Sequence, residues 1–212
     1  SETEEMFKLK FVEIDSNDYQ KADIRFISFS STAENVSPAY ANSPYIYASH
    51  IFLNKEDTEG KFSDGRYGYT TLIHELGHAL GLKHTFEDGR TGKAPSIYNS
   101  SLYSIMSYED VFNTYLTDSY KLNDDEYGIF DLNNYSYRSP SWAIHDIAGL
   151  GKFYSLRDDF NNGDNTYTFV ADDIITRIHD MGGYDTLDLS NSSNSSWDPN
   201  NPLAYIKLGG GA

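Results

Sequence analysis

The sequence contains no cysteine, which excludes disulfide bridges and thiolate metal ligands. Any zinc ion would therefore need histidine, carboxylate, tyrosine or water as its ligands. Basic residues are also scarce, since 16 Lys and Arg stand against 32 Asp and Glu and give a net charge of −16. Such a surface repels phosphate, so we expect no nucleic acid partner. The acidic excess is explained either by solubility or by carboxylates that bind cations such as Ca²⁺.

Long apolar runs are missing as well. No segment approaches the roughly 18 apolar residues that a membrane-spanning helix needs, so we expect no membrane span. The first ten residues lack the basic start and the apolar stretch of a signal peptide. We therefore expect a mature protein or a fragment of one. A length of 212 residues allows one large domain, or one domain with a small appendage.

Apolar periodicity predicts a mixture of strands and helices. Helical spacing predicts helices over about 68–80 and 141–154, and Gly81 is a natural stop for the first of them. The region 87–138 is irregular and rich in Asn, Asp, Ser and Tyr, which predicts long ordered loops. Alternating patterns predict strands at 7–14, 22–30, 45–54, 165–170, 185–190 and 203–208.

Three of the six histidines fall within "HELGHALGLKH", from His74 to His84. His74 and His78 are four residues apart on a predicted helix, so both imidazoles project from one face and can share a metal. Gly81 allows a sharp turn, after which His84 can return as a third ligand. Glu75 lies beside the first ligand, where it could take a proton from a metal-bound water. Three histidines on zinc leave a coordination position open, which indicates a catalytic site.

"HELGHALGLKH" fits the pattern HExxHxxGxxH, so the chain resembles the metzincin zinc metalloproteases. "SIMSY", which ends at Tyr108, resembles the Met-turn of that clan and of its serralysin-like branch, the peptidase family M10 type. The resemblance implies that Met106 shapes the floor under the zinc ligands. It also implies that Tyr108 is a catalytic residue that reaches the zinc or stabilises the oxyanion. Taken alone, "SIMSY" would be an ordinary core methionine beside one of 18 tyrosines.

The same resemblance implies an α+β fold of the metzincin type. It consists of a twisted, mostly parallel sheet with an antiparallel edge strand, an active-site helix, and an irregular lower subdomain with a C-terminal helix. The start of a β-rich calcium-binding appendage follows. We accordingly expect a catalytic domain at 1–157 and a short β-rich segment, resembling the serralysin calcium-binding junction, at 158–212.

Metzincins pair an extended substrate with an edge strand upstream of the active-site helix, and the strand predicted at 45–54 occupies that place in the sequence. The resemblance thus implies that Ser49, His50 and Ile51 contact the substrate by backbone pairing. For His50, an ordinary exposed strand histidine is the alternative interpretation. His145 and His179 lack a ligand spacing, and we expect both to be structural or solvated.

"DMGGYD" (180–185) offers two carboxylates around a Gly-Gly bend, and oxygen ligands suit Ca²⁺. An ordinary Gly-Asp turn would show the same pattern. Its resemblance to serralysins implies calcium ligands at Asp180, Gly182 and Asp185, opposed by backbone carbonyls near Asn161, Gly163 and Asn165.

The resemblance as a whole implies a secreted zinc endopeptidase of the class EC 3.4.24, in which Glu75 assists the attack of zinc-bound water on a protein or peptide substrate. Two alternatives remain: a processing protease of narrow specificity, and a surface-layer-associated binding module that retains the zinc fold. An intact Glu75 opposes an inactive form.

Thr85 stands where serralysins usually have proline, and no array of GGxGxDxUx repeats follows the catalytic part. We expect either a part of a longer secreted or surface-associated protein, or a lineage without the array. The resemblance and the absence of cysteine point to a bacterial, extracellular protein.

Overall fold

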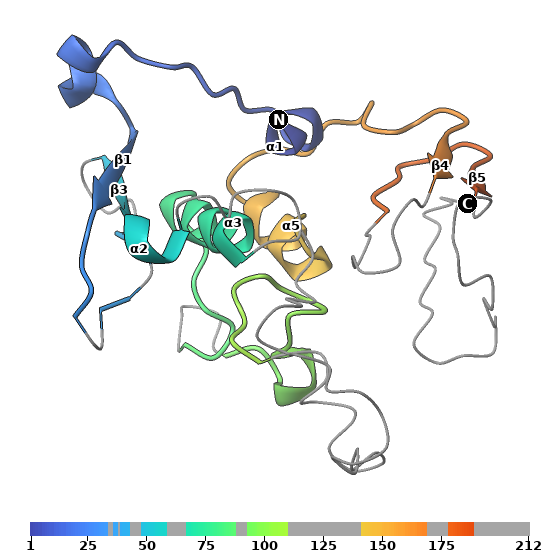
Figure 1. Ribbon diagram of the computed structural model, residues 1–212. Coiled ribbons are helices and arrows are strands. Elements are labelled where there is room, and N and C mark those ends of the chain that lie inside the picture. Colours follow the sequence, from blue (N-terminus) through green and yellow to red (C-terminus); the bar gives the residue numbers. More distant parts are fainter. Residues whose placement is uncertain are drawn as a thin grey trace.

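The computed structural model describes residues 1–33, 36–37, 39–42, 48–58, 67–87, 93–109, 141–168 and 178–188. The described part has mixed α and β structure, with a small sheet on one side, helices in the middle and a second pair of strands on the far side (Figure 1). The predicted strand at 203–208 lies outside the described residues, as do residues 88–92 and 110–138 of the predicted loop region.

The larger sheet has three strands in the order β1-β3-β2. Strand β1 (Ile24–Phe29) runs parallel to β3 (Ser49–Asn54), and β2 (Ala39–Ala41) runs antiparallel to β3. Among the described strands of this sheet one pair is parallel and one antiparallel, and the antiparallel strand β2 lies at an edge of the sheet. The arrangement corrects the expectation that the strand at 45–54 is the edge, because β3 is the central strand.

The strand predicted at 7–14 is wrong. Phe7 alone forms an isolated antiparallel bridge, with Leu156, and residues 8–15 form no strand. Phe11 and Val12 are exposed, with 37% and 69% of their surface accessible. An alternating pattern becomes a strand only where a neighbouring strand completes its backbone hydrogen bonds, and none of the described strands pairs with this segment.

Helix α3 (Tyr67–Ala79) lies between the sheet and helix α5 (Ile144–Leu150), as Figure 1 shows, and contacts β2 and β3. It ends as predicted. Gly81 takes a φ of +105°, and the N–H of Leu82 donates to the carbonyl of Gly77 at 2.8 Å. This hydrogen-bonded glycine stop turns the chain back toward the helix that it has just left.

Helix α5 is shorter than the predicted 141–154, and the apolar residues of that range are only partly buried. Trp142, just before it, is 1% exposed and Leu150 is fully buried. Ile144 and Phe153, however, are 49% and 65% exposed. The helix is too short for its apolar residues to share one continuous stripe.

The main core joins segments far apart in the sequence. It contains Met6, Phe7, Leu80, Leu82, Ile105, Met106, Trp142 and Leu150. Helix α1 (Glu2–Met6) enters this core, and the indole N–H of Trp142 donates to the Thr3 hydroxyl at 3.0 Å. The end of α3, the segment around Met106 and the start of α5 therefore pack together in this core.

Two further short strands, β4 (Thr166–Thr168) and β5 (Thr186–Asp188), pair in parallel, and both agree with the predicted strands there. Short helices complete the described elements: η1 (Ser16–Lys21), α2 (Lys55–Thr58) and η2 (Ser96–Tyr98). Among the described residues, no helix is long and apolar enough to cross a membrane.

Candidate metal centre

The three histidines of "HELGHALGLKH" converge on one point. His74 and His78 project from the last turns of α3, and His84 returns after the Gly81 turn. The Nε2 atom of His84 lies 3.2 Å from that of His74 and 3.1 Å from that of His78. Zn–N bonds of roughly 2.0–2.1 Å at tetrahedral angles would place ligand nitrogens about 3.3 Å apart. The spacing of the three nitrogens therefore fits a tetrahedral zinc ion.

The opposite nitrogen of each ring is held by an oxygen atom. His74 Nδ1 lies 2.7 Å from the carbonyl of Ile105, and His78 Nδ1 lies 3.0 Å from the carbonyl of Leu82. His84 Nδ1 lies 2.8 Å from Oε1 of Glu87. A carbonyl oxygen accepts only from a protonated nitrogen, so Nδ1 carries the proton and the Nε2 lone pair faces the metal position. The three rings are thus oriented and protonated as metal ligands.

Glu75 lies beside His74 and is buried, with 6% of its surface exposed. Among the described residues no group hydrogen-bonds to its Oε2 atom, and the backbone N–H of Ala41 donates to the carboxylate. Burial raises the pKa of Glu75 to about 7, and the Ala41 hydrogen bond opposes this rise only in part. A carboxylate with a pKa near neutrality can both accept and return a proton at physiological pH.

The segment predicted to be a Met-turn runs under the histidines. Met106 is 1% exposed, and its sulfur would lie only 2.7 Å from a Cβ added at Gly77. Glycine at that position therefore lets α3 approach Met106. Met106 thus packs against the helix that bears His74 and His78, and its role as a floor under the ligands stays a prediction.

A buried carboxylate anchors this turn. Asp146 of α5, 1% exposed, accepts hydrogen bonds from the Ser104 hydroxyl at 2.6 Å and from the backbone N–H groups of Ile105 and Ala143, both at 2.9 Å. The same residue, Ile105, uses its carbonyl to hold His74. Asp146 is thus linked to a metal ligand through a single residue.

Tyr108 lies beside two of the three histidines. Its ring centroid is 5.7 Å from that of His74 and 4.6 Å from that of His84. Its side chain is 61% exposed, so a bound molecule could reach it. Phe86 stacks on His84 with 4.8 Å between ring centroids, and its ring centroid lies 5.1 Å from that of Tyr108. An exposed aromatic rim therefore borders the metal position.

Thr85, the departure from the serralysin pattern, has a defined contact. Its hydroxyl donates to Oδ1 of Asn99, which also accepts a hydrogen bond from the Ser107 hydroxyl at 3.0 Å. Asn99 thereby joins the loop that bears His84 to the turn that bears Tyr108. Proline at position 85 has no hydroxyl and could not make this bond.

The sequence arguments missed Glu87, Asp146 and Asn99. Glu87 follows the last ligand by three residues, a spacing that could have identified it. The turn hydrogen bond from its N–H to the His84 carbonyl, at 3.2 Å, keeps it close. The His84 hydrogen bond lowers the pKa of Glu87, which keeps it ionised. Asp146 and Asn99 gave no local signal, because the partners that define their roles lie elsewhere in the sequence.

The three residues predicted to contact substrate lie on β3, the central strand. Ser49 and Ile51 are buried at 1% and 0% exposure, and His50 lies 3.2 Å from the guanidinium of Arg25. Both edges of β3 are paired with neighbouring strands, so its backbone cannot add a substrate strand there. Among the described strands of this sheet, β1 and β2 are the edges, and β2 is the antiparallel one.

The predicted calcium residues lie on two segments, 161–165 and 180–185, that pack together. Asp185 accepts from the Asn165 N–H at 3.0 Å, and Asp180 accepts from the Gly182 N–H at 2.8 Å and from the Tyr167 hydroxyl at 2.5 Å. The side chain of Asn161 donates to the carbonyl of His179 at 2.8 Å. A Cβ added at Gly183 would lie 2.3 Å from the carbonyl oxygen of Gly163. The segments meet as expected, and calcium there stays a prediction.

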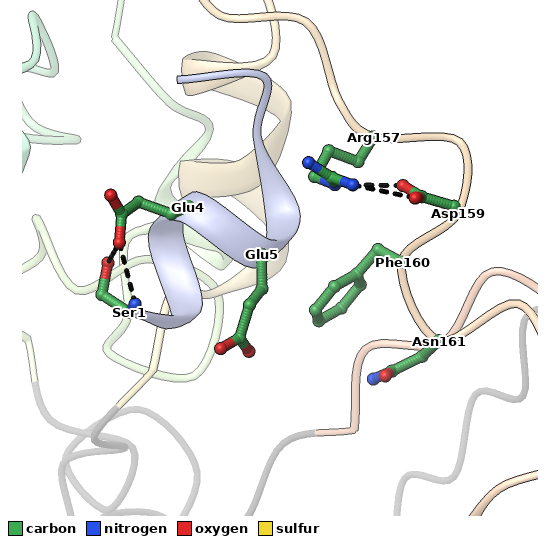
Figure 2. Close-up of a pocket in the computed structure, with 7 residues that line it drawn as sticks. All are labelled: Ser1, Glu4, Glu5, Arg157, Asp159, Phe160 and Asn161. Atoms are coloured by element: carbon green, nitrogen blue, oxygen red, sulfur yellow. Dashed lines mark hydrogen bonds and ion pairs between the residues drawn. The ribbon is translucent and has the colours of Figure 1, made fainter. Parts of the chain in front are cut away.

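A surface pocket lies elsewhere, between α1 and the chain that follows α5 (Figure 2). It is lined by Ser1, Glu4, Glu5, Arg157, Asp159, Phe160 and Asn161. None of the three histidines lines it. The hollow is therefore separate from the metal centre, and its rim includes the first residue of the chain.

Comparison with known proteins supports the same family. The chain is 30% identical over 206 residues to the metallopeptidase AprA of Pseudomonas marginalis, a match that covers 85% of this chain and 40% of that protein. It is 28% identical over 229 residues to serralysin B of Dickeya chrysanthemi, covering 95% of this chain and 44% of the relative. Serralysin C of the same bacterium is 31% identical over 157 residues, which is 68% of this chain and 31% of the relative.

The chain is homologous to the serralysin-type metallopeptidases. These relatives are named metallopeptidase and serralysin, and this chain has a histidine triad, His74, His78 and His84, that could hold a metal ion. No family model matches the sequence. The chain spans about 40% of the length of the first two curated relatives that it matches.

Proposed function

We propose that this chain is the catalytic part of a secreted bacterial zinc endopeptidase. The observation that carries the proposal is the convergence of three Nε2 atoms at 3.1 and 3.2 Å, each on a ring whose Nδ1 is held by an oxygen acceptor. His74, His78 and His84 would hold the zinc. When bound, zinc supplies a Lewis acid that polarises a carbonyl and makes water acidic near neutral pH.

Glu75 is the proposed general base. Its pKa of about 7 and its unpartnered Oε2 suit it to take a proton from the attacking water and to pass it to the leaving amine. Tyr108, exposed beside two of the histidines, is placed to donate a hydrogen bond to the oxygen on which negative charge develops. These two roles agree with those that the sequence suggested.

Strand β2 is the proposed binding edge for an extended peptide substrate. It has one neighbour among the described strands, β3. The backbone N–H of its residue Ala41 donates to Glu75, which places the edge directly beside the base. Backbone pairing of this type accepts many sequences and leaves selectivity to side chains that border the cleft.

We also propose a division of the chain into two parts. The catalytic domain covers 1–157, and 158–212 is a β-rich junction in which calcium joins the two segments that contain Asp180 and Asp185. The chain acts on proteins or peptides outside the cell as part of a longer protein. If calcium binds, it raises the unfolding temperature of the wild-type chain but not that of Asp180→Asn/Asp185→Asn.

The test is cleavage of a random peptide library by the zinc-loaded chain, read by mass spectrometry. We expect wild-type cleavage and a rate loss of roughly 10²–10⁴-fold in Glu75→Ala. Glu109→Gln, which removes an exposed carboxylate next to Tyr108, is the matched control and should cleave normally.

The pattern of cleavage separates the alternatives. Cuts after many different sequences indicate a general endopeptidase, whereas a single motif indicates a narrow processing enzyme. Peptides that bind without being cut would replace the proposal with a binding module. Cleavage that survives in Glu75→Ala would remove the proposed base.

A further inference from the structure

The three candidate ligands are not held alike. His74 and His78 are oriented by main-chain carbonyls, those of Ile105 and Leu82, whose positions are fixed by the core. His84 is oriented by a side chain, the carboxylate of Glu87. That carboxylate lies at the surface, since the Glu87 side chain is 44% exposed while the His84 side chain is 15% exposed.

His84 also lacks the support of a helix. It lies in the irregular segment beyond the glycine stop of α3, whereas the other two ligands belong to the helix itself. Besides the other site residues, the ring contacts Phe86, which stacks on one face with an interplanar angle of 7°. Stacking limits the tilt of the ring, but it permits rotation within the ring plane. The Glu87 hydrogen bond to Nδ1 fixes that rotation and so aims Nε2 at the metal position.

We infer that Glu87 is a positioning residue, which sets the orientation of His84 and thereby the affinity of the site for zinc. The inference rests on the proposed zinc site. A bound cation adds a second effect, because a carboxylate behind a histidine makes the imidazole a stronger donor. The orientation of His84 therefore depends on a side chain, whereas backbone carbonyls fix the orientation of the other two ligands.

A surface ion pair is the simple competing explanation. Exposed pairs three residues apart contribute less than about 1 kcal/mol to stability. An ion pair with no role beyond closing the turn between His84 and Glu87 would affect the folded chain equally with and without metal. Metal affinity therefore separates the two explanations.

The experiment measures zinc dissociation constants by competition with a chromophoric chelator, for the wild-type chain, Glu87→Ala, Glu87→Gln and the control Glu109→Gln. We expect Glu87→Ala to bind zinc roughly 10–100-fold more weakly, the range typical of lost outer-sphere partners. Glu87→Gln keeps an oxygen acceptor and should recover most of that loss. The visible spectrum of the cobalt-substituted chain should change in Glu87→Ala and stay unchanged in Glu109→Gln.

Circular dichroism of each metal-free variant checks that it is folded before affinity is measured. Zinc affinity of Glu87→Ala within twofold of wild type would overturn the inference, as would an equal loss in Glu109→Gln. Peptide cleavage is recorded on the same wild-type sample. If the affinities follow the expected order but the wild type cleaves nothing, the proposed peptidase activity fails and the role of Glu87 stands.

Discussion

Replacing Asp146 tests the link between the buried core and the metal centre. The Asp146 carboxylate accepts from two backbone N–H groups and one hydroxyl, and the residue is 1% exposed. Asp146→Ala removes both acceptor oxygens and with them all three hydrogen bonds. Water cannot replace them at a site so fully enclosed without opening the packing around it.

The size of the effect follows from the donors left behind. Each buried backbone N–H without a partner costs about 1–3 kcal/mol. The two N–H groups of Ile105 and Ala143 together give a loss of roughly 2–6 kcal/mol in the free energy of unfolding. Asp146→Asn keeps one oxygen that can serve both N–H groups, and the Ser104 hydroxyl can reorient toward the new amide. We expect that variant to lose only about 1 kcal/mol.

Urea unfolding of the metal-free chain, followed by circular dichroism, measures this order. Asp18→Ala is the matched control, because Asp18 is 53% exposed and its ion pair with Lys21 is at the surface. It should change the free energy of unfolding by less than about 1 kcal/mol. If Asp146→Ala is no less stable than Asp18→Ala, the Asp146 hydrogen bonds do not hold the turn and the reasoning fails.

Three further changes have defined outcomes. Gly77→Ala places a Cβ 2.7 Å from the Met106 sulfur, so we expect a loss of about 1–3 kcal/mol in thermal unfolding experiments and weaker zinc binding. Glu75 has a folded pKa of about 7, above its usual 4.5, so its charged form is destabilising in the metal-free fold. This penalty is absent below about pH 4.5, grows as the pH rises and is complete above about pH 7. Glu75→Gln should therefore have a free energy of unfolding roughly 1–3 kcal/mol above that of wild type at pH 8 and equal to it at pH 4. An equal difference at both pH values would contradict burial of the charge as the cause. Gly183→Ala meets the carbonyl of Gly163 at 2.3 Å at a φ of +126°, so proteolysis of the segment beyond residue 160 should be faster than in wild type, and an unchanged cleavage rate would show that the loops can separate.

Local patterns predicted the features that depend on few neighbours. The helix that bears His74 and His78, its glycine stop and the return of His84 all follow from spacing within eleven residues. The position of Met106 under the helix agrees with the resemblance of a five-residue motif. These features could be predicted because helical periodicity and glycine conformation act over one or two turns.

Features that depend on partners far along the chain could not be predicted. The pattern at 7–14 alternates like a strand, yet strand formation depends on a neighbour that its own sequence does not specify. The edge position expected for β3 is wrong for the same reason, because the short strand β2 (Ala39–Ala41) pairs with it. Asp146 became recognisable only when the fold placed its carboxylate against the Ser104 hydroxyl, which lies 42 residues away.

Main-chain anchoring has a consequence for how this protein tolerates mutation. No substitution can delete the carbonyl groups of Ile105 and Leu82, because every amino acid carries one. Variation at those positions is therefore limited by the fit of a side chain in the core rather than by hydrogen bonding to the histidines. The rings of His74 and His78 keep their hydrogen-bond acceptors after any side-chain substitution that preserves the path of the backbone. The residues around this centre can therefore vary while these two histidines keep their orientation.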